Sequence, residues 1–132
     1  MPTKGSVSAA GLDLYADIQN GNITILPGQT TMIHTGISAE IPEGYFGGLY
    51  ARSGLATKQG VRPANCVGII DSDYRGEVIV ALHNDSSEAV TVSAGQRIAQ
   101  LVIQPYLGVE VEETEDLSDT NRGFGGFGST GK

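Results

Sequence analysis

A turn-rich segment near the middle of the chain holds the first residues whose types could do chemistry. Asp71 follows a short apolar run and opens a stretch, residues 71–76, that ends just before Glu77. Asp, Ser and Gly favour turns, so this stretch is predicted to be a hairpin loop between two strands. A carboxylate at a strand end can act as general base on a water molecule. Taken alone, a turn-forming role is the simpler interpretation of Asp71, and Tyr74 could pack on a sugar or on the core.

Arg52 and Ser53 form a second chemical feature, at the start of a predicted short helix. Residues 53–59 begin with Ser53, a good N-cap residue, contain helix formers and stop before Gly60. The free backbone N–H groups of such a helix start, together with Arg52, suit an anion such as phosphate. An ordinary capped helix beside a surface arginine explains the same residues, so the pattern alone leaves both interpretations open.

The last eleven residues, 122–132, form a glycine-rich tail that also contains Arg122, two phenylalanines and the Ser129-Thr130 pair. A guanidinium makes charge-assisted bonds to phosphate, an aromatic ring stacks on a base, and glycine lets backbone N–H groups approach phosphate oxygens. A nucleotide is the ligand that needs all three. Such a tail cannot offset its own ordering entropy, so it is expected to be mobile until a ligand binds. A disordered tail without a ligand is the alternative.

Short strands must position these residues. Nineteen glycines and five prolines separate runs rich in Val, Ile, Thr and Tyr, a spacing that predicts an all-β sandwich, jelly roll or barrel. At 132 residues the chain is predicted to be one domain. The predicted strands cover residues 22–26, 30–34, 45–50, 66–70, 77–83, 89–92 and 98–104.

Charge and composition exclude several classes of protein. The net charge is −7, but six acidic residues fall within residues 110–119, which leaves nine acidic against eight basic residues elsewhere. The rest of the protein therefore neither repels an anionic ligand strongly nor offers the basic face that nucleic acid requires. No apolar run is long enough to span a membrane, and the N-terminus lacks a secretion signal. A single cysteine, Cys66, fits the cytoplasm; a Cys66–His83 nucleophile pair stays open.

Five segments, taken together, resemble in order the motifs of the trimeric dUTP pyrophosphatases (dUTPases). The resemblance covers nearly the whole chain. Each motif alone is weak, whereas five in order within so short a chain are specific. The segments are residues 10–16 (AGLDLYA), 52–56 (RSGLA), 65–77 (NCVGIIDSDYRGE), 95–101 (GQRIAQL) and 122–131 (RGFGGFGSTG).

The resemblance implies a distorted jelly-roll β-barrel with one short helix, assembled as a homotrimer. Each active site would lie at a subunit junction. One chain would supply the first, second and fourth motifs, a second chain the third motif, and the tail of the third chain would close over the nucleotide. The chain would then comprise a barrel core (residues 1–109), an acidic linker (110–121) and a mobile C-terminal arm (122–132).

The implied activity is Mg²⁺-dependent hydrolysis of dUTP to dUMP and pyrophosphate, which removes dUTP from the nucleotide pool. Asp71 would activate the water that attacks the α-phosphorus. Asp13 would reach Mg²⁺ through water, which suits an ion that keeps several waters. The contacts to the phosphates would come from Arg52, Ser53, Gly54 and Gln100 in the core and from Arg122, Gly128, Ser129 and Thr130 in the arm.

By the same resemblance, the hairpin would select base and sugar. Backbone groups around Gly68 and Ile70, with the Asn65 amide, would pair with uracil, whereas cytosine would leave buried groups unpaired. Tyr74 would lie under the deoxyribose and exclude a 2′-hydroxyl. Phe127 would stack on the uracil.

The sequence departs from the family pattern at two places, and two other functions remain open. Nine residues precede Ala10, where family members usually have a further strand, and Ala51 replaces a common proline. One alternative is dCTP deaminase, which shares the fold but is not expected to combine this hairpin with this fifth motif. The other is a regulatory binding protein on the same fold. The expected location is cytoplasmic, or nuclear or virion-associated for a eukaryotic or viral source, with no membrane or nucleic-acid partner.

Overall fold

Strands dominate the computed structural model, which describes residues 1–19, 21–65 and 67–126. The described part of the chain holds no helix long and apolar enough to cross a membrane. Within these ranges the strands are β1 (Thr3–Lys4), β2 (Leu12–Tyr15), β3 (Asn22–Ile25), β4 (Thr30–Ile33), β5 (Tyr45–Ala51), β6 (Val61–Pro63), β7 (Gly68–Ile70), β8 (Val80–Asn84), β9 (Val90–Ser93) and β10 (Arg97–Pro105), and the helix is α1 (Ser53–Gln59).

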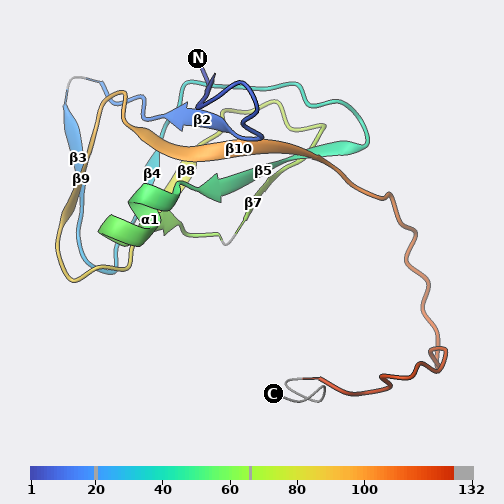
Figure 1. The fold of residues 1–132 in the computed structure, drawn as a ribbon. Coiled ribbons are helices and arrows are strands. Elements are labelled where there is room, and N and C mark those ends of the chain that lie inside the picture. Colours follow the sequence, from blue (N-terminus) through green and yellow to red (C-terminus); the bar gives the residue numbers. More distant parts are fainter. Residues whose placement is uncertain (20, 66, 127–132) are drawn as a thin grey trace.

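The strands form three antiparallel sheets (Figure 1). The largest has the strand order β1-β2-β10-β5-β7, the second β4-β8-β6, and the third pairs β3 with β9. In the largest sheet β10 lies between β2 and β5, so that Gln100 is opposite both Asp13 and Tyr50. β2 carries the first motif, β10 the fourth, and β5 leads directly into the second motif at the start of α1. Because β10 lies between β2 and β5, the three motifs lie side by side.

Alternation along the strands builds the apolar core. In β8, for example, Val80 and Leu82 are buried and the residues between them are half-buried, as expected of a strand with one face inward. α1 adds a single buried side chain, Leu55, and packs against β6. The fully buried Asn84 is satisfied, since its Nδ2 donates to the Ile25 and Glu88 carbonyls at 2.9 and 2.7 Å.

The all-β class with one short helix is confirmed, and so is the helix over residues 53–59. Each predicted strand range overlaps an observed strand, although β8 starts at Val80 rather than at residue 77. Three strands were missed. β1 and β6 have only two and three residues, and β2 has four, too few for a clear alternating pattern. β1 pairs with β2, so a short strand does precede the first motif.

The predicted N-cap was wrong by one residue. Arg52, in extended conformation, is the N-cap and makes no side-chain capping bond, while Ser53 is the first helical residue. The reason is that β5 runs straight into the helix, so Arg52 is still extended. At the other end the prediction holds, because Gly60 ends the helix with a left-handed φ of 66°.

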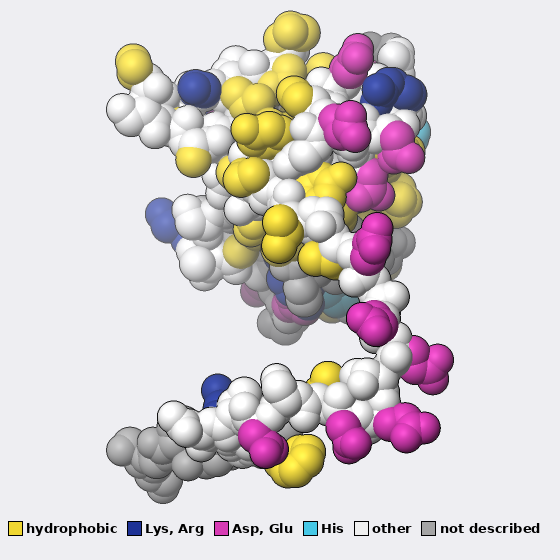
Figure 2. Space-filling model, turned by 90° about the vertical axis from the view of Figure 1, so that its right-hand side faces the viewer, with side chains coloured by type: hydrophobic (Ala, Val, Ile, Leu, Met, Phe, Trp, Pro, Cys, Tyr) yellow, Lys and Arg dark blue, Asp and Glu magenta, His cyan; other side chains and the backbone are white. Residues whose placement is uncertain are grey.

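Beyond β10 the chain leaves the sheets and runs away from them (Figure 1). Residues 105–124 are exposed throughout, including apolar side chains such as Leu107 and Val111. Acidic side chains lie along this stretch (Figure 2). An exposed segment of this kind has no apolar core of its own, so its position depends on the partner or ligand that it contacts.

Two separate features of the fold require glycine at position 60. Its φ is left-handed, and a Cβ there would lie 3.0 Å from Ser86 Cβ and 3.1 Å from Ser86 N. Gly60→Ala should lower the free energy of unfolding by about 2–3 kcal/mol, through backbone strain plus this clash. Gly28→Ala is the matched control, because φ is 71° there and nothing lies within 4 Å. It should cost only about 1–2 kcal/mol. Denaturant unfolding measures both, and equal losses would contradict a role for the Ser86 contact.

Candidate functional site

The predicted site residues of one chain fall into two groups at opposite ends of β5. Arg52 follows the last residue of β5, beside β2 and β10. Ile70, the last residue of β7, pairs with Gly47 near the start of β5, so the hairpin that carries Asp71 begins at that end. A single chain therefore does not bring Arg52 and Asp71 together.

The first group lines a pocket of about 740 Å³ between the first, second and fourth motifs. At its edge lies Asp13, a carboxylate that is only 11% exposed. Its Oδ1 accepts a hydrogen bond from Arg52 Nε at 2.9 Å, and its Oδ2 accepts one from Arg97 Nη1 at 3.1 Å. Asp13 thus holds two guanidiniums side by side, and their remaining N–H groups are available to an anion.

Arg97 is a site residue that sequence reasoning missed. It lies in the fourth motif and on β10, where it pairs with Tyr15, two residues beyond Asp13. The signal was its place inside the motif, but only the pairing of β10 with β2 shows that it shares a carboxylate with Arg52.

Gln100 and the start of α1 complete this pocket. Gln100 Nε2 donates to the Ala51 carbonyl at 2.9 Å, which ties its amide to the end of β5. A Cβ on Gly11 would lie 2.6 Å from Gln100 Oε1, so the glycine makes room for that amide. Ser53 and Gly54 are exposed in the first turn, where backbone N–H groups have no partner inside a helix. Together these groups offer donors to an oxyanion.

The residues present fit Mg²⁺ only as an ion that is held mainly by the phosphate oxygens of a bound substrate. Both oxygens of Asp13 already accept bonds from arginines. Across residues 1–19, 21–65 and 67–126, no group of three or more His, Cys, Asp or Glu side chains could hold a metal ion. Mg²⁺ commonly keeps several waters and binds substrate phosphates with few protein ligands. An ion bound to phosphate oxygens, with Asp13 reaching it through water, agrees with this donor set.

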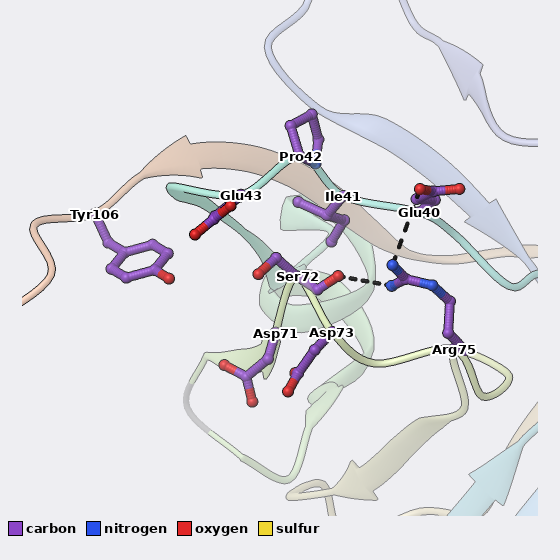
Figure 3. A pocket seen from close by; sticks show the side chains of 9 residues that line it. All are labelled: Glu40, Ile41, Pro42, Glu43, Asp71, Ser72, Asp73, Arg75 and Tyr106. Carbon is purple, nitrogen blue, oxygen red and sulfur yellow. Dashed lines mark hydrogen bonds and ion pairs between the residues drawn. The ribbon is translucent and has the colours of Figure 1, made fainter.

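The second group lies on β7 and the hairpin. Asp71 lines an open pocket of about 700 Å³ beside the hairpin (Figure 3). Together with Ile70 and Tyr74 it also lines a smaller pocket of about 280 Å³. Asp71 is exposed at the end of β7, and its carboxylate points to the same side as that of Asp73 (Figure 3). Arg75 turns back into the loop, where its Nη1 donates to the Ser72 carbonyl at 2.6 Å. The backbone N–H of Tyr74 donates to the Asp71 carbonyl at 3.1 Å. These bonds close the hairpin and leave the Asp71 carboxylate facing solvent.

Asn65 and Gly68 lie close together at the start of β7. A Cβ on Gly68 would be 2.9 Å from Asn65 Nδ2, so glycine allows the amide to lie against the strand. Within the described residues β7 is the edge strand of its sheet and pairs with β5 alone, so its other edge has backbone groups to offer. Gly68 and Ile70 belong to this strand, as the predicted base-reading backbone requires.

Glu77 ties the end of the hairpin to the chain after β4. Its Oε2 accepts from His34 Nδ1 at 2.7 Å, and its Oε1 accepts from the backbone N–H groups of Thr35 and Gly36 at 3.0 and 2.8 Å. The hydrogen bond from His34, followed by that from Gly36, lowers the pKa of Glu77 below its ordinary value of 4.5. The carboxylate is therefore held in its charged form.

Arg122 is the one predicted site residue of the arm within the described part of the chain, and it belongs to neither group. Arg122 Nε donates to the Gly125 carbonyl at 2.7 Å, on the segment that runs away from the sheets (Figure 1). Phe127, Gly128, Ser129 and Thr130 lie outside the described residues, as does Cys66.

Together, these features define an all-β protein with an arginine-lined pocket that could hold an anion. A family model described as dUTPase matches residues 1–131. The deoxyuridine 5'-triphosphate nucleotidohydrolase of Anaeromyxobacter sp. (strain Fw109-5) is 49% identical over 132 residues, which are 100% of this chain and 88% of that protein. That of Finegoldia magna is 46% identical over 131 residues, 99% of this chain and 91% of that protein. The chain therefore belongs to the dUTPase family, as its five motifs indicated.

Solved structures agree with this assignment. The Staphylococcus bacteriophage 80alpha dUTPase with dUPNHPP matches with a TM-score of 0.84 and 29% identity, covering 100% of this chain and 92% of that chain. The dUTPase from Streptococcus mutans matches with a TM-score of 0.76 and 29% identity, covering 84% and 89%.

The lowered pKa of Glu77 predicts how its contribution to stability depends on pH. A carboxyl whose pKa is lower in the folded state stabilises the fold above its unfolded pKa, and this contribution is lost as the pH falls through the folded value. Glu77→Gln should therefore melt at a lower temperature than the unaltered chain at about pH 7, with the difference shrinking below about pH 4. Glu88→Gln, at an exposed glutamate before β9, is the control and should show no such trend. A Glu77→Gln difference that does not change with pH would contradict the charged hydrogen-bonded state.

Proposed function

We propose that this chain hydrolyses dUTP to dUMP and pyrophosphate with Mg²⁺, by attack of water on the α-phosphorus. The observation that carries the proposal is the pocket in which Asp13, Arg52 and Gln100, from three separate motifs, converge. Relatives nearly half identical to this chain are named deoxyuridine 5'-triphosphate nucleotidohydrolases, and the phage relative has been solved with dUPNHPP. The reaction would remove dUTP from the nucleotide pool and supply dUMP, a role that fits the cytoplasm.

The phosphate grip would come from the arginine-lined pocket. Arg52, Ser53, Gly54 and Gln100 would bind phosphate oxygens, and the position of Arg97 beside Arg52 adds a further cation. When bound to the triphosphate, Mg²⁺ would neutralise charge that develops on it. The part of Asp13 would be to orient the arginines and to contact the ion's waters.

Asp71 would be the general base that takes a proton from the attacking water. Its carboxylate is exposed, and so accessible to water, on a hairpin whose backbone is closed by the bond from Tyr74 N–H to the Asp71 carbonyl. A positioned general base contributes about 10²–10⁴-fold to a rate. The chemistry also requires the phosphates to be held near this carboxylate, which one chain does not achieve.

We infer a homotrimer with shared active sites from this incomplete arrangement. Because Arg52 and Asp71 lie at opposite ends of β5, a second copy would have to bring its hairpin to the pocket of the first. The three sheets would then form parts of a distorted jelly-roll barrel over residues 1–109. Exposed apolar residues near the end of β10, among them Ile103, Tyr106 and Leu107, would gain cover from a neighbouring copy.

The arm would complete the site. Residues 110–121 would act as an acidic linker, and residues 122–132 as a mobile arm from the third copy that closes over the nucleotide. Arg122, Gly128, Ser129 and Thr130 would contact phosphates, and Phe127 would stack on uracil. The exposure of residues 105–124 in a single chain supports an arm whose partner is elsewhere.

Specificity would reside in β7 and in the hairpin. The free edge of β7 around Gly68 and Ile70, with the Asn65 amide, would present a fixed order of donors and acceptors to uracil. A base with the reversed order leaves buried groups unpaired, which costs more than the loss of an apolar contact. Tyr74 would lie under the deoxyribose and exclude UTP.

A pyrophosphate-release assay with Mg²⁺ across dUTP, dTTP, dCTP and UTP tests the function directly. The unaltered chain should turn over dUTP by preference, and Asp71→Asn should lower kcat by about 10²–10⁴-fold while dUTP still binds. Asp73→Asn is the matched control on the same hairpin and should retain activity. Near-normal turnover by Asp71→Asn would refute Asp71 as the base, and ammonia release from dCTP would identify a deaminase instead.

Deletion of residues 122–132 tests the arm. The truncated chain should lose most of its activity, because phosphate and base contacts are removed. It should melt at about the same temperature, because the buried core of the described residues lies between Leu14 and Leu101. Light scattering should give both proteins the mass of a trimer. Normal turnover without the arm would exclude it from catalysis, and an active monomer would contradict the shared site.

A further inference from the structure

Tyr74 is an exposed side chain that the hairpin nevertheless holds at two points. Tyr74 as a whole residue is 44% exposed. Its backbone N–H donates to the Asp71 carbonyl at 3.1 Å, and its hydroxyl donates to the Glu77 carbonyl at 2.9 Å. The second bond fixes the far end of the ring, so the direction of the ring depends on where the Glu77 backbone lies.

Gly76 brings the ring close to the backbone. A Cβ at this position would lie 2.6 Å from Tyr74 Cζ and 3.0 Å from Cε2, so a larger residue would displace the ring. The tyrosine therefore lies flat against its own hairpin rather than projecting freely from it.

The Glu77 side chain fixes this backbone from the other side. It receives three hydrogen bonds from residues 34–36, more than forty positions earlier in the chain. Two neighbouring bonds reinforce the junction: Thr35 Oγ1 donates to the Val78 carbonyl at 2.6 Å, and Val78 N donates to the Ile37 carbonyl at 2.7 Å. The junction is thus cross-linked by both side-chain and backbone bonds.

The segment that receives Glu77 is itself constrained. The backbone N–H of Asp17 donates to the His34 carbonyl at 2.8 Å. Gly36 has a φ of 65°, and a Cβ there would lie 2.9 Å from Asp17 Oδ2. Residues 34–36 are therefore anchored to the chain after β2, which gives Glu77 a fixed point to bind.

We propose that Glu77, together with His34, is a positioning residue that sets the sugar selectivity of the enzyme by fixing the Tyr74 ring. The proposal rests on the proposed function, in which Tyr74 excludes the 2′-hydroxyl. Glu77 itself need not touch the substrate, because it acts through the backbone carbonyl that receives the Tyr74 hydroxyl. Steric exclusion of one hydroxyl requires a ring that cannot yield, and the Glu77 bonds remove that freedom.

Measurements of kcat/KM for dUTP and UTP test this role. Glu77→Ala should lower the ratio of kcat/KM for dUTP to kcat/KM for UTP by about 10-fold, chiefly because UTP becomes a better substrate. Glu77→Gln retains an acceptor for Thr35 and Gly36 and should show a smaller loss. Glu88→Gln is the control and should leave the ratio unchanged. Melting curves establish that each variant is folded at the assay temperature.

A double-mutant cycle separates positioning from a general structural effect. Tyr74→Phe removes the hydroxyl that binds the Glu77 carbonyl, so it should reproduce the loss of selectivity. Combining it with Glu77→Ala should add little, because both changes free the same ring. If Glu77→Ala does not fold, Glu77→Gln takes its place in the cycle.

Two results would overturn the proposal. One is an unchanged dUTP-to-UTP ratio in the folded Glu77 variants, even if overall activity falls. The other is a double variant whose loss of dUTP-to-UTP selectivity equals the product of the losses in the two single variants, which would mean that Glu77 and Tyr74 act independently. Absence of pyrophosphate release from dUTP by the unaltered chain would instead refute the proposed function, and this inference with it.

Discussion

The pairing of β10 with β2 on one side and β5 on the other is the constraint on which the site depends. It sets Gln100 opposite both Asp13 and Tyr50 and brings Arg97 within reach of the Asp13 carboxylate. Asp13 and Gln100 are 87 residues apart in the chain, so only the ladder of backbone hydrogen bonds makes them neighbours. A slip of one residue would turn every side chain of β10 to the other face and dismantle the pocket.

The same sheet is the reason for proposing a site shared between copies. β5 connects the two groups of site residues, with α1 following one end and the hairpin lying near the other. A seven-residue strand extends for about 20 Å, so side chains at its two ends cannot contact one substrate phosphate. The sheet that positions both groups therefore keeps them apart, which is why the proposed function joins them through assembly of several copies.

Much of this arrangement was predictable from the sequence, and the parts that were not have physical reasons. The helix over residues 53–59 was predicted, since Gly60 gives a strong stop signal, and five short motifs identified the family. The cap was misplaced because Ser53 is a good N-cap type, whereas the run of β5 into the helix gave Arg52 that position. Arg97 and His34 were missed because their partners, Asp13 and Glu77, lie 84 and 43 residues away. Local patterns carry no signal for such pairs.

The charge arrangement around Asp13 shows how an acidic protein can keep an anion site. Two guanidiniums share one carboxylate, so the cluster retains one unit of positive charge. Removing a largely buried carboxylate from water is costly, and here two charge-assisted bonds offset that cost. The arginines are therefore held in position, and a phosphate that binds as proposed would need little reorganisation of them. Most of the acidic excess lies in residues 110–119, on the segment that leaves the sheets (Figure 2), so it hardly weakens the field in the pocket.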